Sequence, residues 1–169
     1  MLARALSGLS DEWVMLRGYR NRRGETDHVL VGPHGLWAVE VKHRRVRLNA
    51  AGDEWWYEKL DSRGNVVETG RAVDGGGRNW GRQVNDVAVD LAAWLARNGH
   101  RIPVHTAVML MHDRAQIGTC EQLTVDLLAT RPADLLDALT RRPRRLSSDS
   151  CAEIASLIRR DHRFHAKRR

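Results

Sequence analysis

The stretch from Gly24 to Lys42 constrains the fold of this chain more than any other. It places apolar residues at 29–31 and 36–39 on either side of Gly32-Pro33-His34-Gly35. Apolar runs around a turn of this composition are typical of two short antiparallel β-strands. If the proline and histidine are the central turn residues, positions that face each other across the hairpin have numbers that add up to 67.

This register sets two carboxylates against each other. Asp27 lies directly across from Glu40, and because side chains alternate along a strand, Lys42 shares their face. Directly opposed side chains lie about 4.5–5.5 Å apart at Cβ, where two carboxylates repel. A divalent cation between them turns the repulsion into ligation, and Mg²⁺ typically takes one or two carboxylates with water and phosphate oxygens. The lysine can orient a nucleophilic water or stabilise a developing negative charge. The alternative is a solvated hairpin with surface ion pairs.

A family resemblance rests on the same residues. Gly-Glu-x-Asp-His, a hairpin and Val-Glu-Val-Lys resemble the nuclease-related domain (NERD), a branch of the PD-(D/E)xK nuclease superfamily. Asp27 matches the first acid of the motif, Glu40 the second and Lys42 its lysine. The resemblance implies a metal-dependent phosphodiesterase core in which the backbone carbonyl of Val41 is a further ligand. It covers about residues 12–110.

Two further features bear on this resemblance. Gln83 lies in the first turn of a helix expected from about residue 81 to 98. It resembles the glutamine that related nucleases hold near the scissile phosphate or the metal-bound water, although an exposed surface glutamine is the alternative. The family's first helix usually carries a glutamate that helps to hold the metal. Here no acid precedes Asp11, so that ligand is either missing or lies upstream of the given start.

The order of the remaining elements predicts an α/β fold. We expect a restriction-endonuclease-like core, with a central mixed β-sheet flanked by helices and followed by C-terminal helices. A capping box, Ser150-x-x-Glu153, marks the start of the last helix. Residues 1–158 are expected to form one domain, and residues 159–169 a frayed polybasic tail. The other expected elements are a first helix ending near residue 8, strands near 12–20, 43–48, 55–57, 66–68, 104–111 and 123–125, and a helix near 132–139.

The net charge of +7 is unevenly distributed. Residues 141–169 hold ten Arg and Lys against three Asp and Glu, and residues 17–47 hold eight against three. Cations beside a metal site would bind phosphates and position a nucleic-acid backbone, whereas a solvated, charge-protected edge strand is the alternative. The residues expected to contact nucleic acid are Arg44, Arg45, Arg47, Arg168 and Arg169.

Composition favours a cytoplasmic protein without a membrane partner. No run approaches the roughly 20 apolar residues of a membrane span. The two cysteines, Cys120 and Cys151, are far apart and form no CxxC pair, so neither a disulfide scaffold nor a zinc site is indicated.

The sequence therefore predicts a metal-dependent nuclease that hydrolyses DNA phosphodiester bonds with Mg²⁺ or Mn²⁺. The expected catalytic residues are Asp27, Glu40, Lys42 and Gln83, and the expected metal ligands are Asp27, Glu40 and Val41. Two alternatives stay open. One is a non-catalytic nucleic-acid-binding module on a degenerate nuclease fold, which the missing acid favours. The other is an enzyme that cleaves RNA, because nothing in the sequence reads a 2′-hydroxyl.

Overall fold

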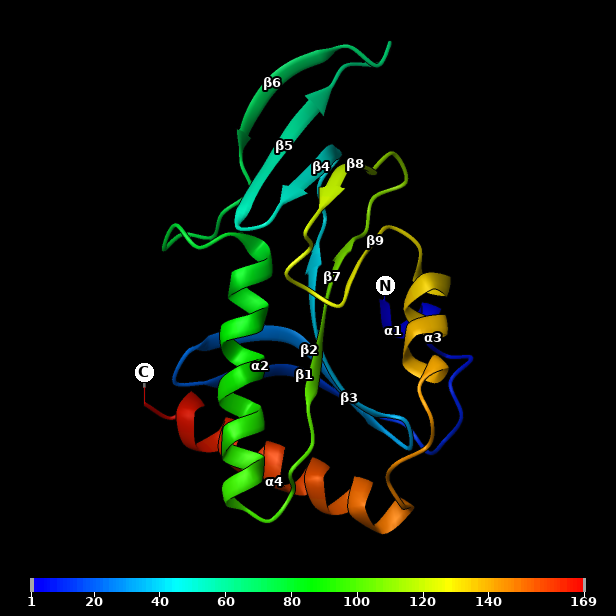
Figure 1. Ribbon diagram of the computed structural model, residues 1–169, viewed down its shortest axis with the longest axis vertical. Coiled ribbons are helices and arrows are strands. Elements are labelled where there is room, and N and C mark those ends of the chain that lie inside the picture. Colours follow the sequence, from blue (N-terminus) through cyan, green and yellow to red (C-terminus); the bar gives the residue numbers. More distant parts are fainter. Residues whose placement is uncertain (1, 169) are drawn as a thin grey trace.

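The computed structural model describes residues 2–168 and has the α/β order that the sequence predicts (Figure 1). Its helices are α1 (Leu2–Ala5), α2 (Trp80–Arg97), α3 (Pro132–Arg141) and α4 (Ser148–Ala166). Its strands are β1 (Val14–Asn21), β2 (Gly24–Gly32), β3 (Gly35–Lys42), β4 (Val46–Ala51), β5 (Glu54–Leu60), β6 (Val66–Arg71), β7 (Val104–Leu110), β8 (Gln116–Glu121) and β9 (Leu127–Ala129).

The strands form two sheets, where the sequence led us to expect one. The larger sheet has the order β1-β2-β3-β7-β9, and it is mixed because β1, β2 and β3 pair antiparallel whereas β7 and β9 continue it in parallel. The smaller sheet has the order β6-β5-β4-β8. The chain leaves the larger sheet after Lys42, and β4 then pairs with β5 and β8. In Figure 1 the strands β5 and β6 project from the rest of the molecule.

The hairpin has the register that the sequence predicts. His28 pairs with Val39, and Gly32 pairs with Gly35, so the numbers of facing residues add up to 67. Gly35 has a φ of 132°, a backbone conformation that residues with a side chain rarely adopt, and this explains the glycine at the end of the turn. The turn is also anchored to the rest of the fold, because the Pro33 carbonyl accepts hydrogen bonds from the backbone of residues 145 and 146.

Helices cover both faces of the larger sheet (Figure 1). Neighbouring residues of β3 pack on opposite faces, as alternation along a strand requires. Leu36 belongs to a buried cluster with side chains of α2 and α4, whereas Trp37 belongs to one with side chains of α1 and α3. Together with its partner strands, β3 is thus buried on both sides along most of its length, and only its carboxyl end reaches polar surroundings.

Helix α2 follows the predicted bounds closely, because its apolar residues recur at helical spacing. Its buried face includes Val84, Val87, Leu91 and Leu95. The Asn79 side chain accepts a hydrogen bond from the backbone N–H of Arg82 and so caps the first turn. This cap fixes the start of the helix, and with it the direction of the side chains in the first turn.

Three predictions for the second half of the chain are wrong. The strand expected at 123–125 is absent from the described residues, which instead form β8 and β9 on either side of it. Ser147 rather than Ser150 caps α4, since its Oγ accepts from the Ser150 backbone N–H at 3.1 Å. The end is not frayed at 159–166, because α4 continues to Ala166. Asp161 is buried there and accepts a hydrogen bond from the Tyr19 hydroxyl at 2.6 Å.

Among the described residues, no helix combines the length and the apolar character needed to cross a membrane.

Candidate active site at the carboxyl end of β3

The two predicted acids lie at the end of the β2–β3 ladder. The last pair of the ladder is His28 with Val39. Asp27 precedes His28 in β2 and Glu40 follows Val39 in β3, so each acid lies one position beyond that pair. The Asp27 Oδ2 accepts a hydrogen bond of 2.7 Å from the backbone N–H of Val41. Asp27 therefore takes the place that a backbone carbonyl of β2 would have if the ladder continued, and its carboxylate is held at the edge of β3.

Glu40, Lys42 and Gln83 form one hydrogen-bonded cluster. The Lys42 Nζ donates to Glu40 Oε1 at 2.7 Å and to Gln83 Oε1 at 3.2 Å. The Gln83 Nε2 donates to the same Glu40 oxygen at 3.1 Å. Strand alternation brings the acid and the lysine onto one face, and the capped first turn of α2 supplies the glutamine. The exposed surface position that was the alternative for Gln83 is therefore excluded.

Burial makes the negative charge of Glu40 unfavourable. Glu40 is only 5% exposed, and the loss of solvation raises the pKa of its carboxyl above the ordinary value of 4.5. The hydrogen bond and the charge of Lys42 oppose that rise in the pKa, whereas the negative charge of Asp27 adds to it. The Lys42 side chain is 19% exposed. A further positive charge near both carboxylates would stabilise their ionised forms.

Aromatic rings lie beside the cations at this site, and sequence reasoning missed these contacts. The Lys42 Nζ lies 5.5 Å from the ring centroid of Trp80, the first residue of α2. The Arg44 guanidinium lies 6.0 Å from the same ring and 5.1 Å from the ring of Tyr57 in β5. Cations at these distances are attracted to the ring faces. The one available signal is that Trp80 precedes Gln83 by three residues, which puts both on neighbouring positions of one helix.

The donor atoms fit a hard divalent cation. Among the described residues, Asp27 Oδ1 has no hydrogen bond, so this carboxylate keeps a free oxygen beside its engaged Oδ2. The Glu40 carboxyl accepts from the side chains of Lys42 and Gln83 at Oε1, and a hydrogen bond from the Asp27 backbone also lowers its pKa. The N–H and C=O groups of one residue point to the same side of a strand, so the Val41 carbonyl faces the side on which Asp27 lies. Oxygen donors of this kind suit Mg²⁺, which completes its shell with water and phosphate oxygens.

The described side chains do not form a complete metal site by themselves. Across residues 2–168, no group of three or more His, Cys, Asp or Glu side chains gathers in a way that could hold a metal ion. Helix α1 carries no acid in the part that the structure describes. Its residues Leu2 and Ala3 border a pocket of about 330 Å³ that Asp27 and Val41 also line. The helix side of the site therefore offers apolar side chains where the family pattern usually has a glutamate.

The same pocket contains polar residues that sequence reasoning did not select. His28, Arg17 and His43 line it together with Asp27. The His28 Nδ1 is buried and has no hydrogen-bond partner among the described residues. Burial lowers the pKa of the His28 imidazole, so the ring is neutral at pH 7. Alternation along β2 does not indicate it, since His28 directly follows Asp27 and is expected on the opposite face.

The predicted nucleic-acid-binding arginines do not form one surface. Arg44 lies beside the cluster, as described above, and Arg45 lines a separate pocket of about 460 Å³. Arg47 is held by an ion pair with Glu58, with 2.7 Å between Nε and Oε2. Arg168 lies over the ring of Phe164 at the end of α4, 4.7 Å from its centroid. Arg169 lies outside the described residues.

A mixed sheet between helices, with two acids and a lysine at the end of adjoining strands, is compatible with a nuclease-like α/β fold. The family model of the nuclease-related domain matches residues 1–111, about two thirds of the chain, and the chain belongs to this family. Comparisons with curated proteins and with solved structures found no match. The family supports a nuclease-related function. The matched part ends just after β7, so it contains the cluster but not β8, β9, α3 or α4.

Proposed function

We propose that this protein is a metal-dependent nuclease that hydrolyses DNA phosphodiester bonds, with Mg²⁺ or Mn²⁺ as cofactor. One observation carries the proposal. In a chain of the nuclease-related family, Lys42 and Gln83 both converge on one oxygen of the buried Glu40, beside Asp27. A hairpin with only solvated surface ion pairs would have no reason to bury this acid.

The metal would be held by Asp27, Glu40 and the carbonyl of Val41. Asp27 would offer its Oδ1, which has no hydrogen bond among the described residues, and the cation would offset the repulsion between the two carboxylates. When bound, such an ion supplies an acidified water and a positive charge beside the scissile phosphate. Water and phosphate oxygens would complete the shell, which is why two carboxylates are enough.

Lys42 is the residue that we expect to stabilise charge in the reaction. Its ammonium is held by Glu40 and Gln83, and the ring of Trp80 limits its movement. A positioned cation stabilises negative charge as it develops on the phosphate oxygens, without reorganisation at the moment of reaction. Gln83 has an auxiliary role, because it touches both the acid and the lysine and keeps them in place.

The substrate assignment rests on charge. Residues 17–47 carry an excess of five cations around the hairpin, and the planar guanidinium of arginine suits phosphate oxygens. Arg44 contacts the rings of Tyr57 and Trp80, and we expect it to bind the nucleic-acid backbone close to Lys42. DNA is the proposed substrate, and RNA is the alternative substrate, which a cleavage assay on both nucleic acids distinguishes.

A second candidate function is a non-catalytic nucleic-acid-binding module. The observation that favours it is the absence of an acid from the described part of α1, beside the pocket that Asp27 lines. Its consequence is measurable, because such a module would retain nucleic-acid binding but would cleave nothing.

The test is a cleavage assay with the pure protein on supercoiled, linear, single-stranded and branched DNA and on RNA. Each substrate is incubated with Mg²⁺, Mn²⁺ or EDTA. We expect cleavage with either metal and none with EDTA, and loss of activity in Glu40→Gln. Glu121→Gln removes the same charge at an exposed position and is the matched control. Binding without cleavage on every substrate would reject the nuclease in favour of the binding module.

A further inference from the structure

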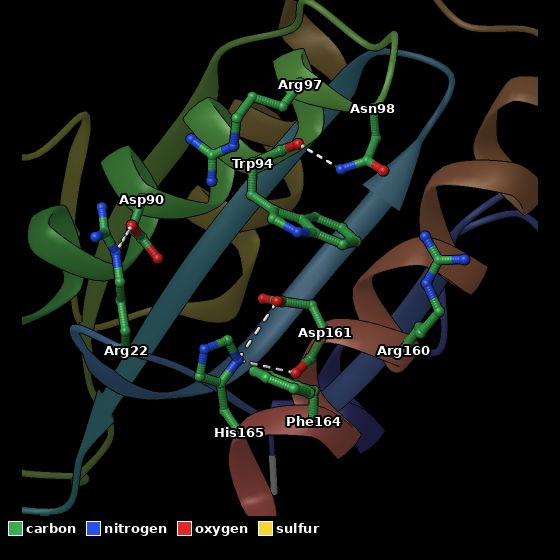
Figure 2. A pocket seen from close by; sticks show the side chains of 9 residues that line it. All are labelled: Arg22, Asp90, Trp94, Arg97, Asn98, Arg160, Asp161, Phe164 and His165. Atoms are coloured by element: carbon green, nitrogen blue, oxygen red, sulfur yellow. Dashed lines mark hydrogen bonds and ion pairs between the residues drawn. The ribbon is translucent and has the colours of Figure 1, made fainter.

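A second pocket, drawn in Figure 2, lies beside the end of α2 that is opposite to the candidate active site. Its volume is about 660 Å³, and side chains of α2 and α4 line it together with Arg22 from the turn between β1 and β2. It shares no residue with the Glu40, Lys42 and Gln83 cluster. Trp94, near its centre, follows Gln83 by eleven residues, or about 16 Å along the helix axis.

Two aromatic rings from different helices face this pocket. Figure 2 shows the indole of Trp94 from α2 in the middle of the view and the ring of Phe164 from α4 below it. Phe164 is 55% exposed, and it is one of the few large apolar side chains on the surface. The edge of its ring meets His165, and the guanidinium of Arg168 lies over its face. Trp94 is partly buried against the core, so only part of its indole borders the pocket, whereas Phe164 is exposed. Aromatic rings with cations beside them are a platform on which a nucleobase stacks.

The arginines around the rings carry uncompensated charge. Arg97 and Arg160 line the pocket, and neither has an ion-pair partner among residues 2–168. In Figure 2 they lie on opposite sides of Trp94. A guanidinium without a carboxylate partner keeps its planar set of donors available for a phosphate.

The acids of the pocket are engaged inside the fold. Asp90 is 8% exposed, and its Oδ1 accepts from Arg22 Nε at 2.6 Å. Asp161 is 6% exposed and accepts from the Tyr19 hydroxyl at 2.6 Å, with His165 Nδ1 3.4 Å from its other oxygen. These acids still disfavour a small anion that enters deeply. They favour a ligand that brings N–H donors to the floor and keeps its negative charge at the rim.

A polar acceptor also remains free beside the indole. The Asn98 Nδ2 donates to the Trp94 carbonyl at 2.8 Å, whereas its Oδ1 accepts no hydrogen bond from any described residue (Figure 2). The amino and ring N–H groups of nucleobases are donors that suit such an acceptor. Rings, acceptors and rim arginines together match a flat, donor-bearing ring with an attached phosphate.

We propose that this pocket binds one nucleotide unit. The base stacks on Trp94 and Phe164, and its phosphate contacts Arg97 and Arg160. The unit comes either from a free mononucleotide or from an unstacked nucleotide of a single strand, which present the same chemistry. The site is independent of the proposed nuclease activity, because it contains none of the residues on which that activity depends.

The experiment measures binding in EDTA, so that cleavage plays no part. The probes are adenosine monophosphate, adenosine, inorganic phosphate and a fluorescein-labelled single-stranded oligonucleotide of ten thymidines. We expect adenosine monophosphate to bind more tightly than adenosine or phosphate alone, because only the nucleotide uses both the rings and the arginines. The oligonucleotide tells a strand from a free nucleotide as the source of the unit.

Variants locate the binding. Phe164→Ala and Arg160→Ala change exposed side chains, and each should weaken binding of the nucleotide or the oligonucleotide about tenfold. Arg101→Ala removes the same charge from an exposed residue outside the pocket and should leave affinity unchanged. Glu40→Gln should also bind normally, so that a failure of the nuclease proposal is separable from a failure here. The proposal is overturned if neither adenosine monophosphate nor the oligonucleotide binds better than phosphate. It is also overturned if Phe164→Ala and Arg160→Ala bind like wild type.

Discussion

The two ends of α2 face two charged sites built from similar residue types. At the first turn, Trp80 and Gln83 contact Lys42, which pairs with the buried Glu40. Eleven residues beyond Gln83, Trp94 faces arginines that have no ion-pair partner in the described chain. Similar residue types thus give a cluster whose polar atoms already bind one another and a pocket in which Arg97 and Arg160 have no ion-pair partner among the described residues. If the two proposals hold, the first site is organised before substrate arrives, and the second gains its contacts on binding.

The largest effect should follow from breaking the buried cluster. Lys42→Ala and Glu40→Gln should each lower the rate of DNA cleavage by about 10³-fold, because a positioned charge is lost from a site with little water. Lys42→Arg should not restore the rate, since a broad guanidinium does not replace a compact ammonium. Single-turnover cleavage measures this, with circular dichroism to confirm folding. A rate within tenfold of wild type would contradict it, and Arg160→Ala should cleave normally.

A smaller loss should follow from removing the residue that positions the cluster. Gln83→Ala should lower the cleavage rate about 10–100-fold, since supporting hydrogen bonds around a metal site have effects of this size. The double variant Gln83→Ala/Lys42→Ala should be no slower than Lys42→Ala alone if the glutamine acts through the lysine. Gln116→Ala, an exposed glutamine of β8, is the control.

A third prediction disturbs the packing at the first turn of α2 without changing a charge, and it should leave the other end of the helix unaffected. A Cβ atom on Gly81 would lie 2.5 Å from the buried ring of Trp55 in β5, so Gly81→Ala must push β5 and the first turn of α2 apart. We expect a loss of about 1–3 kcal/mol in the free energy of unfolding and slower cleavage. Nucleotide binding at the Trp94 pocket should persist. Urea denaturation measures the stability, and Gly75→Ala, whose Cβ would meet nothing within 4 Å, is the matched control.

The smallest expected effect is a pH dependence of stability. Burial raises the pKa of Glu40 above 4.5, so the folded protein binds its proton more tightly than the unfolded chain does. The contribution of Glu40 to stability is therefore complete below pH 4.5 and is lost as the pH rises through the raised pKa. Glu40→Gln has no such loss, and its free energy of unfolding relative to wild type should increase with pH over that range. Urea denaturation in EDTA measures the difference, and an unchanged difference from pH 4 to 8 would contradict the sign.

The sequence predicts local features of the site well. The hairpin register follows from one turn and two apolar runs, and it places Asp27 and Glu40 one position beyond the last ladder pair. The helix that carries Gln83 follows from its apolar period. These features depend on residues close together in the chain, where propensity and alternation decide the structure.

Features that depend on distant residues were missed. Strand β8 is mostly exposed and polar, and it exists because its backbone pairs with β4 some seventy residues earlier. Residues 159–166 appear to be a polybasic tail in the sequence, but buried Asp161 bonds to Tyr19 across 142 positions. The contacts of Lys42 with Trp80 and of Arg44 with Tyr57 also join separate elements. A pattern in one stretch cannot reveal which remote stretch will cover it.

The projecting strands β5 and β6 lie within the connection between β3 and β7, two neighbouring parallel strands. Such a connection needs only a dozen or more residues, and loop-closure entropy grows slowly with further length. The turn at residues 61–65 could therefore lengthen or shorten while the pairing of Lys42 with Leu110 keeps its register. A change in the length of this turn would alter how far the insert projects, and the cluster at the end of β3 would stay the same. The reach of the insert and the geometry of the cluster are therefore separable features of one fold.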